Sequence, residues 1–402
     1  MILRKANLLL SLAIILLLTT IVWGKVFNQA LIGEGSIYFA EPYLSIIKSE
    51  GAAILWSRHD TQAILFFHLI RDVFRDNMKA YMGFLLLGSA FVTVTAFFLI
   101  RKVTGSFLAA TLASILFTAN FIGSFEILGL GYYQWFIQRV PNFGLALISL
   151  ICLHNFLQKK KTADYLLALV LYLLAVFLAR YTIHILPLFA LYIFFTTLMT
   201  RNAKQLRTYL YSFGLILPFL IGSYILMKAQ TLTVGNDNPY FLQDTLSILQ
   251  HVLSRLTYMT LPFLSPSPFL AQTKVTSLIQ QLYPFVSLLY ILGTIFIFRR
   301  LKKAQAFILA LVLSLPLSIY LSIYLNPSFL SYYESSRYLY YSSLLFSIYW
   351  GIVLWQVAQI RKIYLAAVGI FIALWFILNT YFIYQGFAQW QDRHNPVNAT
   401  IE

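Results

Sequence analysis

The chain has 402 residues, of which 60% are hydrophobic and 10% are charged, and its formal net charge is +16. Soluble domains carry roughly 25% charged residues, so this composition excludes an ordinary soluble fold. Apolar runs recur along the whole sequence, and a run of about 20 residues is long enough to cross a bilayer core of roughly 30 Å as a helix. The composition therefore predicts an integral membrane protein.

Eleven apolar runs predict about eleven membrane-spanning helices. We expect an all-α, polytopic transmembrane helical bundle in which residues 1–402 form a single integral membrane domain. No cleavage site of the small-x-small type follows the first run, which favours an uncleaved span over a signal peptide. In chain order the expected spans are 7–24, 80–100, 106–124, 139–157, 164–179, 183–200, 207–227, 281–298, 305–325, 339–358 and 363–385.

Lysine and arginine are concentrated on one set of alternate connections between these spans, with Asp164 as the only acid nearby. By the positive-inside rule this side faces the cytoplasm, so we expect the N-terminus inside and the C-terminus outside a plasma or inner membrane. Anionic headgroups of membrane lipids are sufficient partners for these cations, and no nucleic acid is needed. The basic residues concerned are Arg4, Lys5, Arg101, Lys102, Lys159, Lys160, Lys161, Arg201, Lys204, Arg207, Arg299, Arg300, Lys302, Lys303, Arg361 and Lys362.

The connections on the other side are long at two places, 25–79 and 228–280, and a short outer tail, 386–402, follows the last span. Long loops in a compact protein usually carry function. Both loops contain amphipathic stretches, ILFFHLIRDVFRDNMKAY and DTLSILQHVLSRLTYM, which we expect to lie along the membrane interface as helices. We therefore expect the functional site on the outer face, with 25–79 as its catalytic loop.

The first outer loop offers carboxylates just outside the first span. Glu34 and Glu41 stand where a general base could take a proton from an acceptor hydroxyl, and His59 and Asp60 follow in the same loop. The alternative is that each of these residues is an ordinary solvated loop charge.

Two further outer connections hold ionisable residues beside apolar runs. Glu126 follows the third span, where an acid is costly unless it has a partner, and Arg139 at the start of the next span could be that partner. Arg180 and His184 lie in the short connection ARYTIH. The alternatives are a structural Glu–Arg pair and a packed or interfacial histidine.

The stretch SYYESSRYLYYSSLLF, residues 331–346, places an acid and a base among tyrosines between two apolar runs. Arg337 could hold an anionic ligand at the membrane face through charge-assisted hydrogen bonds. Glu334, about one helical turn away, could orient the guanidinium. Tyr338 and Tyr340 flank the arginine. The alternative is an interfacial aromatic belt with a snorkelling arginine.

The order of these motifs resembles the polytopic C-type glycosyltransferases, the protein O-mannosyltransferase-like enzymes and their bacterial relatives that use polyprenyl-phosphate sugars. Thr104–Ser106 and Glu126 match family positions, whereas Asn120 and Phe121 stand where His-Pro is usual. Pro187 matches the Leu-Pro of a later span whose usual Lys-Glu is missing, and LPFLSPSPF is similar to a Pro-rich segment of the family. The resemblance runs from about residue 30 to 360.

The stretch ESSRYLYYSSLLF resembles the family element E-R-Y-L-Y-L-P-S, although two serines separate Glu334 from Arg337 and Tyr-Ser replaces Leu-Pro. The adjacent acidic pair that the family usually shows in the first outer loop is missing here. Glu41, in FAEPYL, is then the leading match for the family's base and Glu34 the second.

The resemblance implies an inverting glycosyltransferase that moves a sugar from a polyprenyl-phosphate donor to a hydroxyl acceptor on a glycan, lipid or protein. Arg337 would hold the donor phosphate and stabilise it as a leaving group, and Tyr338 and Tyr340 would offer aromatic faces to the prenyl chain and the sugar ring. Glu126 would support the pocket or, if a divalent metal ion is used, be its ligand. Two alternatives stay open. One is a transporter or flippase of a lipid-linked or anionic substrate, a class that more often shows internal repeats and broken spans. The other is a non-catalytic, transferase-like scaffold.

Overall fold

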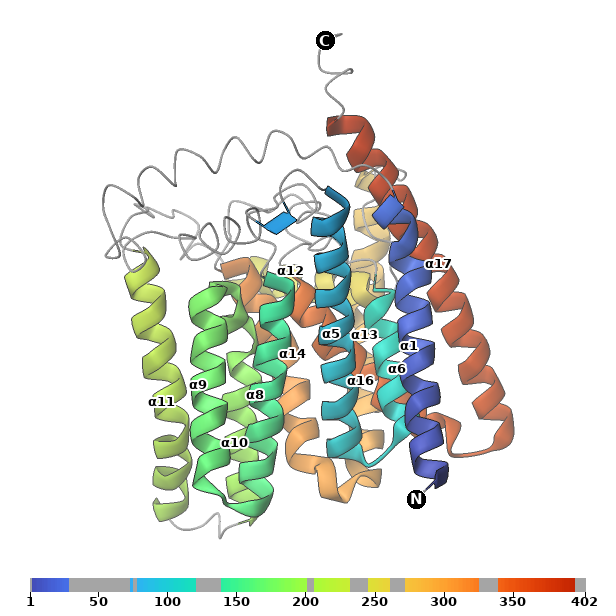
Figure 1. The fold of residues 1–402 in the computed structure, drawn as a ribbon. Coiled ribbons are helices and arrows are strands. Elements are labelled where there is room, and N and C mark those ends of the chain that lie inside the picture. Colours follow the sequence, from blue (N-terminus) through green and yellow to red (C-terminus); the bar gives the residue numbers. More distant parts are fainter. Residues whose placement is uncertain are drawn as a thin grey trace, which may run out of the picture.

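The computed structural model of the chain describes residues 2–28, 73–74, 78–120, 139–200, 206–231, 245–260, 272–324 and 339–394. Every regular element in these ranges is a helix, and most of the helices run side by side through one bundle (Figure 1). The all-α fold class predicted from the sequence is therefore confirmed for this part of the chain.

The helices follow the order predicted by hydropathy. Each of the eleven segments expected to span a membrane coincides with a helix. The elements are α1 (Ile2–Asn28), α5 (Met78–Thr104), α6 (Phe107–Thr118), α8 (Arg139–Lys159), α9 (Thr162–Leu178), the 3-10 helix η3 (Arg180–Ile185), α10 (Leu186–Thr200), α11 (Leu206–Thr231), α12 (Thr245–Thr260), α13 (Gln272–Arg300), the 3-10 helix η5 (Lys302–Ala304), α14 (Gln305–Tyr324), α16 (Tyr340–Ala358) and α17 (Lys362–His394).

Eight of the helices in the described ranges are long and apolar enough to cross a membrane. In α1, α6 and α9 the apolar stretch is shorter, at 10–17 residues. The structure thus supports a membrane protein with eight helices of spanning length. The count of eleven spans stays a prediction.

Several helix ends differ from the predicted span ends. α13 begins at Gln272, inside the predicted second outer loop, and α17 continues to His394, inside the predicted outer tail. Apolarity marks the part of a helix that lies in lipid, whereas backbone hydrogen bonds can continue the helix into water. α6 is shorter than predicted. Ser106 caps its start by accepting from the Ala109 amide, and the helix ends at Thr118.

The short connections after α5, α8, α13 and α16 lie at the same end of the bundle as the N-terminus (Figure 1). Two of them turn through a left-handed residue, Gly105 with φ of 73° and Lys160 with φ of 58°. Glycine adopts this conformation without steric cost. Because these connections carry the basic residues noted above, the cations gather at one end, here called the basic end. The other end is called the opposite end.

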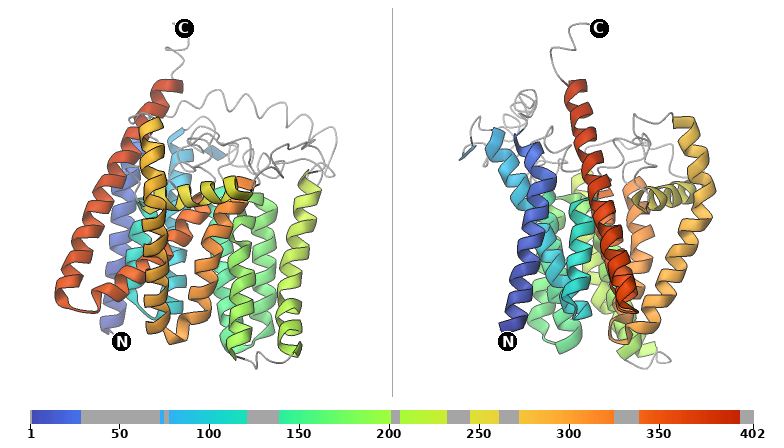
Figure 2. Two further views of the ribbon diagram at one scale, coloured as in Figure 1. Left: turned by 180° about the vertical axis from the view of Figure 1, so that it is seen from behind. Right: turned by 90° about the vertical axis from the view of Figure 1, so that its right-hand side faces the viewer.

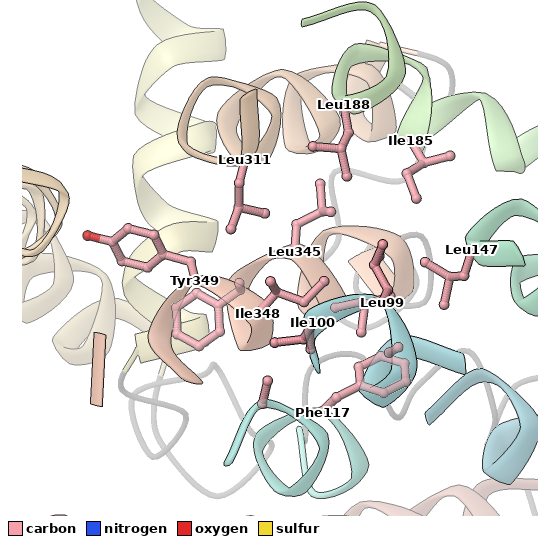
Figure 3. Packing of buried hydrophobic residues seen from close by; sticks show 14 of the residues in the cluster. Leu99, Ile100, Phe117, Leu147, Ile185, Leu188, Leu311, Leu345, Ile348 and Tyr349 are labelled. Carbon is pink, nitrogen blue, oxygen red and sulfur yellow. The ribbon is translucent and has the colours of Figure 1, made fainter. Parts of the chain in front are cut away.

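The centre of the bundle is α16, 83% of whose span is buried, the largest share among the eight helices of spanning length. It is also the least apolar of the eight. α16 crosses α6 closely at Gly351, where a Cβ atom would lie 2.6 Å from the Cα of Ala113. Figure 3 shows Leu345 and Ile348 of α16 among side chains from five other helices. These side chains are Leu99, Ile100, Phe117, Leu147, Leu188 and Leu311.

α11, α13 and α17 lie at the edge of the bundle, with only 17%, 11% and 28% of their spans buried. On α13 the exposed residues Phe285, Leu288, Leu292 and Ile295 recur at helical spacing. A continuous apolar stripe of this kind suits contact with lipid, so the exposed faces of the edge helices agree with a membrane location.

α12 differs from its neighbours in direction, because it lies across the long axis of the bundle near the opposite end (Figure 2). The sequence predicts an interfacial helix at this place, and α12 has the transverse orientation that such a helix requires. It packs against α13 and α14.

α13 is attached to the core through hydrogen bonds made by two tyrosine hydroxyls. The Tyr349 hydroxyl of α16 donates to the Tyr290 carbonyl at 2.6 Å and lies 3.3 Å from Oγ1 of Thr294. The Tyr290 hydroxyl donates in turn to the Val312 carbonyl of α14 at 2.8 Å. These bonds link three helices at a point where the Tyr290 and Tyr349 rings are also in contact, with their centroids 4.5 Å apart.

Tyr349→Phe should lower the free energy of unfolding by about 1 kcal/mol, because it removes one buried hydrogen bond and little volume. Denaturant unfolding in a single detergent measures the change. Tyr381→Phe on the exposed face of α17 is the matched control and should be neutral. Equal shifts in the two variants would show that the Tyr349 hydroxyl does not fasten α13.

Candidate functional site

Most residues that the sequence analysis singles out lie outside the described ranges. This holds for Glu34, Glu41, His59, Asp60, Glu126, Glu334, Arg337 and Tyr338. Four lie inside them. Arg139 is the first residue of α8, Arg180 is the first residue of η3, His184 lies within η3, and Tyr340 is the first residue of α16.

These four positions share the opposite end of the bundle. α8 and α16 each finish in a connection at the basic end, so both begin at the opposite end, and η3 follows α9 there (Figure 1). η3 contacts α8, α14 and α16 directly. The fold therefore brings together three segments that are far apart in the sequence.

His184 is completely buried where these segments meet. Its ring meets the rings of Tyr341 and Tyr181 edge-on, with centroids 5.5 Å and 5.9 Å away. Its Nδ1 lies 3.3 Å from the Ser322 hydroxyl at the end of α14. The alternative that the sequence left open, a packed histidine, describes this environment, which also gives the imidazole polar contact.

The aromatic residues around His184 form a continuous group. Tyr340 packs between Phe117 of α6 and Phe143 of α8, at centroid distances of 5.3 Å and 5.7 Å. Tyr341 lies 4.5 Å from Phe143. Aromatic pairs of this kind contribute about 0.5–1.5 kcal/mol beyond area burial. They fix the first turn of α16 at the opposite end.

Serine hydroxyls extend the group along the contact between α14 and α16. Ser318 and Ser342 are hydrogen-bonded at 2.9 Å, and Ser322 donates to the Ser318 carbonyl at 2.9 Å. Together with the His184 contact they form a line of polar groups from η3 into the bundle. We call His184, Ser318, Ser322, Tyr340, Tyr341 and Ser342 the polar-aromatic cluster.

Two more polar groups lie buried at the ends of the neighbouring helices. Oγ1 of Thr118, in the last turn of α6, and Nδ2 of Asn142, in the first turn of α8, have no hydrogen-bond partner among the described residues. A buried donor left unsatisfied costs about 1–3 kcal/mol. Each of these groups can bind a hydroxyl, and neither was singled out from the sequence.

Arg255 of α12 is a further residue that sequence reasoning missed. It is 2% exposed, although it belongs to a helix predicted to lie at the interface. Val252, Arg255 and Met259 recur at i, i+3 and i+7, so the arginine shares the buried face with two apolar residues. That spacing was the signal in the sequence. An ionisable residue buried in a membrane protein is a candidate functional residue.

Within the described ranges, no group of three His, Cys, Asp or Glu side chains is placed so that it could hold a metal ion. Glu126, the one metal ligand proposed from the sequence, lies outside them. The metal site therefore stays a prediction.

Comparison with known proteins adds no family assignment, because no protein-family model and no curated protein matches the chain.

Proposed function

We propose that this chain is a membrane glycosyltransferase that moves a sugar from a polyprenyl-phosphate donor to a hydroxyl acceptor at the opposite end of the bundle. One observation carries the proposal. Helix ends from α6, α8, η3, α14 and α16 meet in a cluster of aromatic rings, hydroxyls and one histidine. Aromatic faces and neutral hydrogen-bonding groups are well suited to bind sugar rings and their hydroxyls.

The reactive groups come from the chain segments that join this cluster. The segment with Glu334 and Arg337 enters the described part of the chain at Leu339, and Leu339 and Tyr340 are both buried. In this proposal Arg337 holds the donor phosphate and Glu334 orients it, whereas Tyr340 anchors the helix that follows. The segment with Glu126 leaves α6 just after Asn120 and supports the pocket.

The proposed reaction uses the loop between α1 and α5. Glu41, or Glu34 as the second choice, takes the proton of the acceptor hydroxyl as that oxygen attacks the anomeric carbon. The bond from this carbon to the phosphate oxygen breaks, and the lipid phosphate leaves with its negative charge stabilised by Arg337. The basic end faces the cytoplasm, so transfer takes place on the outer side.

The direct test supplies membranes containing the protein with a panel of radiolabelled polyprenyl-phosphate sugars and follows label into water-soluble or acceptor-bound product. We expect transfer from at least one donor. If no donor gives product, and proteoliposomes instead move a labelled lipid-linked sugar across the bilayer, the transporter alternative replaces this proposal.

Arg337→Ala should weaken donor binding by about 2–3 kcal/mol, a factor of about 30–150, because a charged hydrogen-bond donor to the phosphate is lost. Arg337→Lys keeps the charge but lacks the planar fork, so its loss should be smaller. Titration of donor against purified variants measures both. Lys228→Ala, at an exposed position on α11, is the control and should bind like the parent. Equal affinities across the set would leave Arg337 as an interfacial anchor only.

A further inference from the structure

The basic end carries an exposed set of cations, here called the basic face. Its members within the described ranges are Lys102, Lys159, Lys160, Lys161, Arg207, Arg299, Arg300, Lys302, Lys303, Arg361 and Lys362. The described acids at this end are limited to Asp164, which is half-buried. Such an excess of one sign repels itself unless anions from outside the chain lie against it.

Helix stability accounts for only some of these cations, namely Lys102, Lys159, Arg299 and Arg300, which lie in the last turns of their helices, where a cation is favourable. A helix N-terminus carries a partial positive charge, so nearby lysine or arginine is unfavourable. Yet Lys161 immediately precedes α9 without making a side-chain capping bond, and Lys362 is the first residue of α17. Lys302 and Lys303 precede α14 in the same way. These four charges are therefore unfavourable for the helices that they precede, and an anion from outside the chain would offset that cost.

The cations also lie where apolar side chains become exposed. Leu206 and Leu210 are exposed beside Arg207, and Ile363 is exposed beside Lys362. Figure 1 shows α11 at one side of the bundle and α17 at the other, so the pattern recurs on both flanks. An exposed apolar surface ending in a rim of cations matches the boundary between acyl chains and headgroups. A soluble acidic partner would not account for the exposed apolar residues beside the cations on both flanks.

We propose that the basic face binds the headgroups of anionic phospholipids in the adjoining leaflet. The positive-inside rule orients the chain, whereas this proposal adds selective retention of anionic over neutral lipid. Arg101 and Arg300 assist it, because their guanidiniums are held over the rings of Phe107 and Phe296, at 4.0 Å and 4.9 Å from the ring centroids. They are thereby fixed at the level of the helix ends.

The test measures binding of phosphatidylglycerol and of phosphatidylcholine to the purified protein, with no sugar donor present. Retained lipid is counted by native mass spectrometry or by extraction after gel filtration. We expect preferential retention of phosphatidylglycerol in 0.1 M NaCl and loss of that preference near 1 M, where the Debye length falls to about 3 Å. This measurement uses the parent protein alone, so its result does not depend on whether a variant folds.

Two substitutions on the same helix give the matched comparison. Arg207→Gln at the basic end of α11 should weaken phosphatidylglycerol binding about fivefold. Lys228→Gln near the other end of α11 should have less effect, because it lies outside the basic face. The triple variant Lys302→Gln, Lys303→Gln, Lys362→Gln should lose on the order of 100-fold.

Three results would overturn the proposal. The first is equal retention of the two lipids by the parent protein at low salt. The second is equal effects of the two α11 substitutions. The third is tighter binding of soluble polyglutamate than of phosphatidylglycerol, which would assign the face to an acidic protein partner.

Discussion

Gly351→Ala should lower the free energy of unfolding by about 3 kcal/mol, the upper end of what overpacking in a core usually costs. The added Cβ atom would lie 2.5 Å from the Cβ of Ala113, 2.6 Å from its Cα and 2.7 Å from its backbone nitrogen. Side-chain rotation cannot relieve contacts with backbone atoms, so α6 and α16 must move apart. Because α16 is the centre of the bundle, that movement disturbs the core on several sides.

Gly369→Ala on α17 is the matched control, since nothing beyond the local backbone of its own helix lies within 4 Å of the added methyl group. Alanine is favoured over glycine in a helix by about 1 kcal/mol, so this variant should be neutral or slightly more stable. Thermal unfolding and the monodisperse fraction after gel filtration, both in one detergent, report the two effects. Unchanged stability in Gly351→Ala would mean that α6 and α16 are not held in close contact.

Glu41→Gln should reduce sugar transfer by at least about 100-fold while leaving expression and donor binding unchanged. The amide keeps the shape of the side chain but cannot accept a proton, and general-base catalysis contributes about 10²–10⁴ in rate. Glu34→Gln should have a smaller effect. Single-turnover transfer at saturating donor separates the chemical step from binding.

Glu50→Gln provides the control for this loop, because it makes the same substitution at a carboxylate to which no role is assigned. It should transfer at the parent rate. If Glu41→Gln, Glu34→Gln and the double variant all keep full activity, the base does not come from this loop. A parent protein that transfers sugar would then still be a glycosyltransferase, with its base elsewhere.

The helices were predictable because apolar runs and the charges between them are local features of the sequence. The connection ARYTIH separated two apolar runs in the prediction, and the structure places η3 there, between α9 and α10. The basic residues between the apolar runs also marked the positions of the short connections correctly, as at Gly105 and Lys160. Helix ends without a charge nearby were less predictable, as the early end of α6 at Thr118 shows.

The contacts of the candidate site could not be predicted in the same way, because they join residues far apart in the sequence. Nothing near His184 indicates that Ser322 and Tyr341 will contact its ring. His154 is a similar case, since its Nδ1 lies 2.7 Å from the Tyr192 hydroxyl across the contact between α8 and α10. Helical spacing alone would have placed Arg255 on a buried face. Its partners depend on how α12 docks.

The position of α16 in the chain has a consequence for biogenesis. A helix leaves the translocon for lipid according to its apolarity, and α16 is the least apolar of the eight candidate spans, with the buried serines Ser342, Ser343 and Ser347 near its start. Its most extensive contact is with α6, which precedes it in the sequence and is synthesised earlier, as is α14; α17, which packs against it to the same extent as α14, follows it. α16 therefore enters the membrane against protein surfaces that are already inserted. Deletion of α6 should accordingly leave α16 poorly inserted even though its own sequence is intact.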